Sequence, residues 1–170
     1  DILKNFVLNV CKAKQEWTME GFVEKTVKEI SEIEGNVLCG VSGGIDSTVA
    51  ALLIHKAIGD RQTGVFVDNG LLRLDESKEI EDMFKNNFSL NFHRIDASEQ
   101  FLSKLKGITD PEQKRKIVGE EFIQVFTEFA KQKGPFKWLA QGTLYPDVIE
   151  SGVSKGPAAV IKSHHNVGGL

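Results

Sequence analysis

A run of glycine and polar residues, Ser42-Gly43-Gly44-Ile45-Asp46-Ser47, is the part of the sequence best suited to chemistry. Adjacent glycines let backbone amides approach an anion without a Cβ in the way, and a helix that begins here directs its first free N–H groups at that anion. The hydroxyls of Ser42 and Ser47 add donors. A carboxylate at Asp46 would repel a phosphate unless a Mg²⁺ ion lay between them. The run therefore predicts a polyphosphate cradle with a metal at Asp46.

The same stretch partly matches the P-loop motif GxxxxGK[ST], because Gly35 and Gly40 have the required separation. Val41 stands where that motif needs lysine. Without the lysine, the contact to the β- and γ-phosphates is missing, and the sequence argues against a P-loop.

A second motif, the nucleophile elbow GxSxG, is matched in full by Gly40-Val41-Ser42-Gly43-Gly44. A serine hydrolase would use Ser42 as the nucleophile. Asp147, followed by His164 or His165, supplies the acid and the base in the order that this class of enzyme requires. A serine hydrolase is therefore an alternative function for the chain.

The simplest alternative is a tight turn at Gly43-Gly44 in which Ser47 or Asp46 only caps the next helix. A cap contributes about 1 kcal/mol and accounts for one polar residue rather than four. The nucleophile elbow also leaves Asp46 and Ser47 without a role. These considerations favour the phosphate cradle.

Strands and helices alternate around this turn. Unbroken apolar runs predict strands that are covered on both faces, as in a parallel sheet, and apolar residues at spacings of three and four predict helices. Strands are expected at 37–41, 63–67, 91–95, 138–140 and 158–161, and helices at 18–33, 48–58, 75–88 and 112–131. We therefore predict an α/β fold with a doubly wound, mainly parallel five-stranded sheet and helices on both faces. In such folds ligands bind beyond the carboxyl ends of the strands.

Composition excludes several classes of protein. The 170 residues are 41% hydrophobic and 26% charged, as expected for a globular domain, and the net charge of −3 gives no reason to expect nucleic-acid binding. No apolar run approaches the roughly 18 residues that span a bilayer, so no membrane association is expected. Two cysteines without metal-binding spacing indicate a reducing compartment, and we predict a cytoplasmic protein.

The glycine run is similar to the pyrophosphate-binding loop of the N-type ATP pyrophosphatases. Three further segments, 65–73, 137–151 and 161–170, resemble the ATP pyrophosphatase domain of the glutamine-hydrolysing GMP synthetase family. The resemblance covers residues 18–170 and implies a fold of the adenine nucleotide alpha-hydrolase type.

Residues 1–17 resemble the end of the glutamine amidotransferase domain of that family and the linker that follows it. The rest of that domain, and a carboxyl-terminal dimerisation domain, would lie outside residues 1–170. The resemblance therefore implies an amidotransferase domain in the same chain and a homodimer.

The resemblance also implies a reaction. ATP with Mg²⁺ would adenylate the 2-oxygen of XMP and release pyrophosphate, and ammonia derived from glutamine would then displace AMP to give GMP. An alternative within the same family is an ATP-binding module that is inactive as an isolated fragment.

Site residues follow from the same resemblance, matched position by position. ATP would be bound by Ser42, Gly43, Gly44, Ile45, Asp46, Ser47, Thr48, Val67 and Gly142. Asp46 and Lys162 would be catalytic, with Asp46 holding the metal, and XMP would be bound by Arg115, Asp147 and His165. From the residue types alone, Arg115 also fits a solvated charged face, and Asp147 also fits a helix cap.

Overall fold

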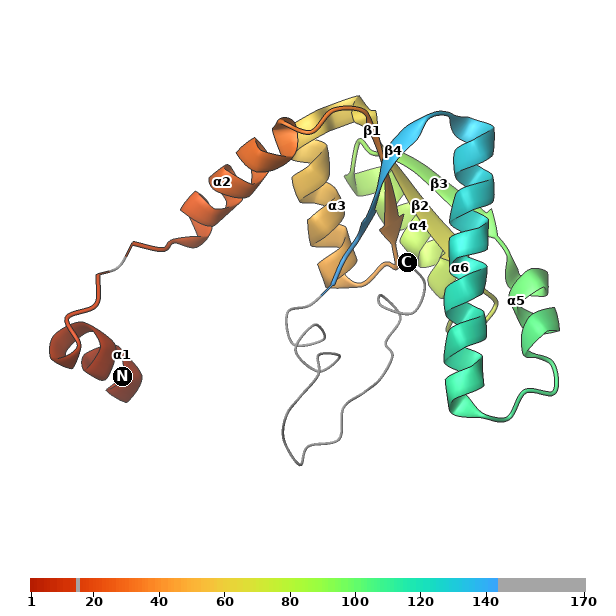
Figure 1. Cartoon of the computed structure of the whole chain (residues 1–170), viewed down its shortest axis with the longest axis horizontal. Coiled ribbons are helices and arrows are strands. Elements are labelled where there is room, and N and C mark those ends of the chain that lie inside the picture. Colours follow the sequence, from red (N-terminus) through yellow and green to blue (C-terminus); the bar gives the residue numbers. More distant parts are fainter. Residues whose placement is uncertain (15, 144–170) are drawn as a thin grey trace.

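The computed structural model describes residues 1–14 and 16–143 (Figure 1). Its strands are β1 (Asn36–Val41), β2 (Gln62–Asp68), β3 (Asn91–Asp96) and β4 (Phe136–Gln141). They form one sheet in the order β3-β2-β1-β4, and all three neighbouring pairs are parallel. The predicted parallel α/β fold is confirmed. The strand expected at 158–161 lies outside the described residues.

Two helices precede the first strand, and the others lie in the connections between the strands. They are α1 (Ile2–Asn5) with a π-helical turn at Phe6–Val10, α2 (Met19–Ser31), α3 (Ile45–Ile58), α4 (Glu76–Asn87), α5 (Ser98–Leu105) and α6 (Pro111–Lys133), and a 3-10 turn at Gly59–Arg61 precedes β2. All four predicted helices are present. Helix α3 begins at Ile45 rather than at the expected residue 48, and α5 was not predicted from the sequence.

Two apolar cores lie on opposite faces of the sheet, as expected for helices on both sides (Figure 1). Alternate residues of each strand point to alternate faces, so Leu38 and Cys39 belong to different cores. The core under α3 and α4 contains Cys39, Val41, Ala51, Phe66, Ile80 and Phe84. The core under α5 and α6 contains Leu38, Val65, Val67, Ala97, Phe101, Val125, Phe126 and Phe129.

The direction of winding reverses beside β1. From β1 the chain moves outward through β2 to β3, and then crosses over through α5 and α6 to place β4 on the other side of β1. In open α/β sheets, this reversal leaves a crevice at the carboxyl ends of the two diverging strands. Here those ends are followed by residues 42–44 and 142–143.

At the amino ends of the strands, two side chains donate hydrogen bonds to the turn between α2 and β1. The guanidinium of Arg61 donates to the carbonyl of Ile33 at 2.6 Å, and the indole N–H of Trp138 donates to the carbonyl of Glu34 at 2.9 Å. Helix α2 then packs against α3. None of the helices in ranges 1–14 and 16–143 combines the length and apolar character needed to cross a membrane.

Candidate functional site

The turn after β1 is shaped by Gly43. Its φ of +80° lies in the left-handed region, and a Cβ built there would lie 2.4 Å from Cδ1 of Ile80 on α4. Gly44 follows in an extended conformation as the N-cap of α3. Because it is a glycine, no side chain caps the first amides of the helix. The turn therefore presents bare backbone at the start of α3, as an anion cradle requires.

Ser47 closes this turn from inside. Its side chain is 9% exposed, and its hydroxyl donates to the carbonyl of Gly44 at 3.1 Å. The same oxygen accepts from the backbone N–H of Ser42 at 3.1 Å and lies 3.0 Å from the Ser42 hydroxyl. Its hydrogen-bonding capacity is therefore used within the turn, whereas Ser42 is exposed.

Free donors remain at the first turn of α3. The amides of Ile45, Asp46 and Ser47 precede the first acceptors available within the helix. The carbonyl of Gly44, in contrast, is satisfied by the N–H of Thr48 at 3.1 Å and by its hydroxyl at 2.9 Å. Ile45 is 77% exposed, and Asp46 is exposed as well. An anion can therefore reach these amides, and the partial positive charge of the helix end attracts it.

Gly142 lies against this first turn from the neighbouring strand β4. A Cβ at Gly142 would lie 3.3 Å from Cα and 3.4 Å from the backbone nitrogen of Ser47. The residue after β4 and the turn after β1, 95 positions apart in the sequence (142 − 47), are thus in contact. The two predicted ATP-binding segments meet at the point where the winding of the sheet reverses.

Val67 lies at the same carboxyl edge. Pairing between β1 and β2 ends at Val41 and Phe66, but β2 stays paired with β3 through Asp68 and Asp96. The side chain of Val67 is 4% exposed and belongs to the core under α5 and α6. A ligand at this edge would therefore meet the backbone of Val67 rather than its side chain.

A polar cluster that sequence reasoning missed continues the edge beyond Val67. Arg94 of β3 donates from Nη2 to Oδ2 of Asp68 at 2.8 Å and from Nε to the hydroxyl of Ser77 at 2.7 Å. Partial burial opposes ionisation of Asp68, but hydrogen bonds from Ser77, Arg94 and the Gly70 amide outweigh it and hold the pKa of this carboxyl below its ordinary value. The available signal was a lone arginine near the end of a strand, adjacent to a strand that ends in aspartate.

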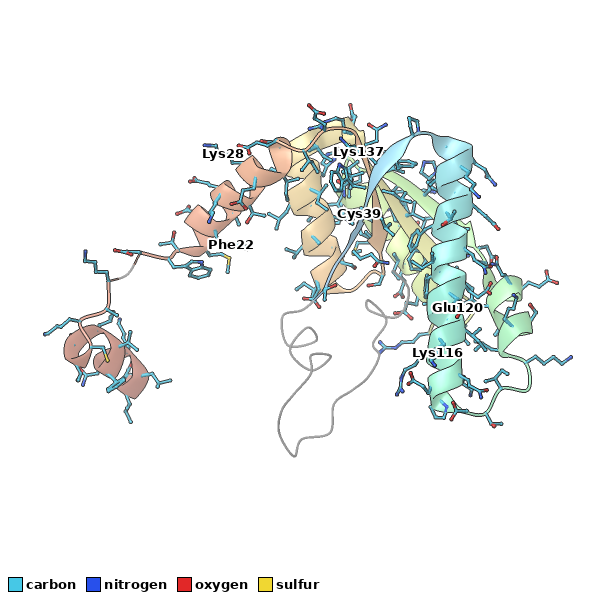
Figure 2. All side chains as sticks on the ribbon, in the orientation of Figure 1. Phe22, Lys28, Cys39, Lys116, Glu120 and Lys137 are labelled. Atoms are coloured by element: carbon cyan, nitrogen blue, oxygen red, sulfur yellow. The ribbon has the colours of Figure 1, made fainter. Side chains whose placement is uncertain are left out.

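Arg115 lies in the first turns of α6, which begin at the carboxyl edge of the sheet (Figure 1). It is exposed, and its guanidinium contacts Oε2 of Glu112 on the same helix at 3.0 Å. Figure 2 shows the neighbouring Lys116 and Glu120 on this stretch of α6. Three other predicted site residues, Asp147, Lys162 and His165, lie outside the described residues, as does His164.

Asp46 is the acidic residue of the first turn of α3. Within ranges 1–14 and 16–143, no group of three or more His, Cys, Asp or Glu side chains could hold a metal ion together. A closed protein cage is therefore not found in that part of the chain. One exposed carboxylate beside an anion cradle does fit Mg²⁺, which is usually bound by one or two carboxylates together with substrate phosphates and water.

The geometry does not favour a serine hydrolase. In a nucleophile elbow the serine itself occupies the strained position of the turn, but here Gly43, not Ser42, has the positive φ. The Ser42 hydroxyl contacts Ser47 Oγ and, at 3.4 Å, the Gly44 amide. Of the histidines in the described part of the chain, His93 packs against the ring of Phe129 on the face of α6, and His55 lies in the last turn of α3, at the far end of that helix from Ser42.

Known proteins match both the sequence and the fold. The NAD synthase family model matches residues 17–123. The chain is 59% identical over 172 residues to the GMP synthase [glutamine-hydrolyzing] of Alkaliphilus metalliredigens, and 56% identical over 172 residues to that of Fusobacterium nucleatum. Each alignment covers 100% of this chain but only 33% and 34% of the relative. The chain thus spans about a third of the length of these curated relatives.

Solved structures share the fold at low sequence identity. The NH3-dependent NAD synthetase from Campylobacter jejuni superposes with a TM-score of 0.60 at 14% identity, covering 79% of this chain and 72% of that protein. The NMN synthetase from Francisella tularensis gives a TM-score of 0.56 at 17% identity, covering 79% of this chain and 69% of that protein. These likenesses support the architecture of the sheet and its helices.

Proposed function

Because the chain belongs to the NAD synthase family, whose N-type ATP pyrophosphatase loop its glycine turn resembles, we propose that it is the adenylating unit of a glutamine-hydrolysing GMP synthase. The observation that carries this proposal is the bare backbone turn at Gly43-Gly44, beside exposed Asp46. The identity of 54–59% to enzymes named GMP synthase [glutamine-hydrolyzing] favours this substrate over those of other family members.

The proposed reaction has two balanced steps. The 2-oxygen of XMP attacks the α-phosphorus of ATP, so a new oxygen–phosphorus bond forms and the bond to pyrophosphate breaks. Ammonia then attacks C2, the bond from C2 to that oxygen breaks, and AMP leaves with the oxygen. The products are GMP, AMP and pyrophosphate, and a proton is released on amination.

The turn after β1 has a specific part in the first step. Its amides at Ile45, Asp46 and Ser47 would hold the β- and γ-phosphates, because helix N-termini bind anions through free N–H groups. In a phosphoryl-type transfer, the protein contributes mainly by positioning the leaving pyrophosphate in line with the attacking oxygen. Mg²⁺ bound at Asp46 would neutralise charge on the phosphates. The backbone of Val67 would contact adenine at the adjoining strand end.

The remaining assignments belong to the same proposal. Arg115, Asp147 and His165 would bind XMP, and Lys162 would contact phosphate as a second catalytic group beside Asp46. Free cysteines, Cys11 exposed and Cys39 buried, fit the cytoplasm, where thiols stay reduced.

We also propose two domain segments. Residues 1–17 would end a glutamine amidotransferase domain and its linker, and residues 18–170 would form the ATP pyrophosphatase domain. The start of α2 supports this boundary, because the Thr18 hydroxyl accepts from the Gly21 amide at 3.1 Å as an N-cap. The segment before it carries exposed apolar side chains at Ile2, Leu3 and Phe6, and Figure 1 shows α1 apart from the sheet. A homodimer would form through residues beyond position 170.

The test is XMP-dependent release of pyrophosphate from ATP by the complete protein, with ammonia or glutamine as the nitrogen source. IMP is the matched control substrate, because it lacks the 2-oxygen that would be adenylated. We expect pyrophosphate and AMP in equal amounts with XMP and neither with IMP. ATP binding without XMP-dependent pyrophosphate would instead identify a nucleotide-binding module. Labelling of Ser42 by a fluorophosphonate would support the serine hydrolase.

A further inference from the structure

Arg94 joins two ends of one loop. The loop of residues 69–75 leaves β2 after Asp68 and enters α4 just before Ser77. Arg94 donates to Asp68 at 2.8 Å and to Ser77 at 2.7 Å, so a single guanidinium holds both the exit and the re-entry of the chain. It also lies 4.0 Å from a carboxylate oxygen of Glu81, one turn further along α4.

The position of Arg94 in the sheet makes this contact possible. Arg94 pairs with Phe66 in the parallel register of β2 and β3, so its side chain lies on the face that α4 covers. From that face the planar guanidinium reaches Asp68, two residues beyond its pairing partner. The carboxyl of Asp68 is largely buried, at 13% side-chain exposure, whereas Arg94 is 32% exposed. Because the Arg94 side chain is 32% exposed, solvent screens the ion pair and limits its contribution to stability, so a role in positioning the loop explains this arrangement better than a role in stability.

The loop of residues 69–75 is connected to the nucleotide-binding edge in two ways, through the chain and through packing. Asp68 directly follows Val67, whose backbone lies at the proposed adenine position. Helix α4, which begins with the residues that Arg94 holds, carries Ile80 against Gly43 of the phosphate turn. Pairing of Val41 with Phe66 sets the separation of β1 and β2, and the packing of Ile80 against Gly43 links the conformation of the phosphate turn to the position of α4.

The loop has limited packing of its own. Leu72 packs against the core under α3 and α4, but Leu71 and Leu74 are 55% and 91% exposed and contribute little. Asp75 has a φ of +62°, a left-handed conformation that is unfavourable for a non-glycine residue and persists only where the surroundings impose it. Hydrogen bonds within the loop are local, such as the Arg73 amide to Glu76 at 2.8 Å.

We propose that Arg94 is a positioning residue of the nucleotide site: it fixes α4 and the 69–75 loop against Asp68 and thereby sets the geometry in which ATP is bound. This inference rests on the proposed function, because it takes the edge from Val67 to Gly43 to be the ATP site. Arg94 itself does not touch the turn after β1. It acts through Asp68, Ser77 and, by way of α4, Ile80.

The experiment compares Arg94→Met, which keeps the aliphatic stem, with Arg94→Lys, which keeps the charge but loses the planar fork. Lys25→Met is the matched control, because it removes an exposed cation from the Lys25–Glu29 pair on α2, away from the site. In the complete protein we measure the Kd of Mg·ATP by calorimetry, KM and kcat with XMP, and hydrogen exchange of the amides of residues 69–75.

We expect Arg94→Met to weaken ATP binding about tenfold, with kcat changed no more than about twofold, since the ATP site loses a pre-organisation that the ground and transition states need equally. Hydrogen exchange in the loop should be faster in Arg94→Met than in the parent. In both Kd and exchange rate, Arg94→Lys should lie between the parent and Arg94→Met, and Lys25→Met should match the parent. An ATP Kd in Arg94→Met equal to that of the parent overturns the inference, whatever the loop does. A parent that binds ATP but releases no XMP-dependent pyrophosphate overturns the proposed function instead, while the change in Kd still tests the role of Arg94.

Discussion

Gly43 and Ile80 lie so close together that nothing larger than a hydrogen fits on the Cα of the glycine. A Cβ at position 43 would lie 2.4 Å from Cδ1 and 2.5 Å from Cγ1 of Ile80. The turn after β1 is thus seated directly on α4, with its amides left facing outward at the start of α3. Glycine is therefore required at position 43 for two reasons. Packing against Ile80 leaves no space for a side chain, and the turn that presents the amides needs a positive φ.

Gly43→Ala should therefore impair both folding and nucleotide binding. The left-handed φ of +80° and the overlap with Ile80 together predict a loss of about 1–3 kcal/mol in the free energy of unfolding. We expect the Kd of Mg·ATP to rise about tenfold or more, because the amides would move. Denaturant unfolding and calorimetry measure the two effects.

The double variant Gly43→Ala, Ile80→Ala separates the two causes. Removing the Ile80 side chain relieves the overlap but leaves the φ unchanged, so the two substitutions should be non-additive by about 1 kcal/mol in the stabilising sense. Gly44→Ala is the stability control, because its φ is −71° and, among residues 1–14 and 16–143, its Cβ would meet the Ser42 hydroxyl alone, at 3.4 Å. Additive effects of Gly43→Ala and Ile80→Ala would show that the contact does not constrain the turn.

Asp46→Asn should change the metal dependence of ATP binding rather than the fold. Asp46 is exposed and in the first turn of α3, so the amide substitution leaves packing intact. We expect the parent to bind ATP more tightly with Mg²⁺ than without, and the variant to lose most of that difference, since one charged ligand is removed. Calorimetric titrations with Mg²⁺ and with a chelator provide the comparison. The same Mg²⁺ dependence in both proteins would remove Asp46 from the metal site.

The two serines of the turn should differ when each is replaced by alanine. Ser47 is 9% exposed and hydrogen-bonds the amide of Ser42 and the carbonyl of Gly44, so Ser47→Ala should lower the free energy of unfolding by about 1–2 kcal/mol. Ser42 is exposed, and Ser42→Ala should lower it by less than about 0.5 kcal/mol. Chemical denaturation of both variants measures this. Equal losses would contradict the assignment of Ser47 as the residue that closes the turn.

Local pattern predicted the sheet well because its signals are short in range. Apolar runs identified β1 and β2, which are buried, and the alternation of strands with helices predicted the parallel sheet, whereas β3 and β4 contain no fully buried residue. Helix α3 was expected from residue 48 because Asp46 and Ser47 were assigned to the glycine run, but they belong to its first turn, where the positive end of the helix dipole favours an acidic residue. Helix α5 was missed although Phe101, Leu102 and Leu105 have helical spacing, because only eight residues carry the pattern.

The candidate site was predictable only where one segment carries the motif. The turn at Gly43-Gly44 is recognisable from its adjacent glycines and polar neighbours. Gly142 was assigned from the family resemblance, and it lies against Ser47 in the structure. The contacts of Ile80 with Gly43 and of Arg94 with Asp68 join residues 37 (80 − 43) and 26 (94 − 68) positions apart. They depend on strand register and on the seating of α4, which single-sequence patterns do not specify.

Cys39 should be chemically silent at neutral pH. Burial among the apolar side chains of the core under α3 and α4 raises the pKa of its thiol to about 11. In the native protein iodoacetamide should therefore label the exposed Cys11 and leave Cys39 unmodified. Mass spectrometry of the labelled peptides decides this, and Cys39 labelling as fast as Cys11 would contradict the burial of the β1 core.

The same shift predicts a pH dependence of stability. The unfolded thiol loses its proton near its ordinary pKa of 9.0, while the folded thiol keeps it to about 11. Over that interval the folded state binds more protons, so stability falls as the pH rises above 9.0. Serine does not ionise in this pH range, so the unfolding free energy of the Cys39→Ser variant should fall less steeply as the pH rises. Parallel slopes in both proteins would show that the thiol is not responsible.

We propose that this chain adenylates the 2-oxygen of XMP, and the fate of that oxygen tests this reaction most directly. XMP labelled with ¹⁸O at C2 is turned over by the complete protein with ATP, Mg²⁺ and ammonia, and the products are analysed by mass spectrometry. Attack by the 2-oxygen on the α-phosphorus predicts that the label appears in the phosphate of AMP and is absent from pyrophosphate and GMP. Label in water or in pyrophosphate, or AMP without label, would contradict the claim.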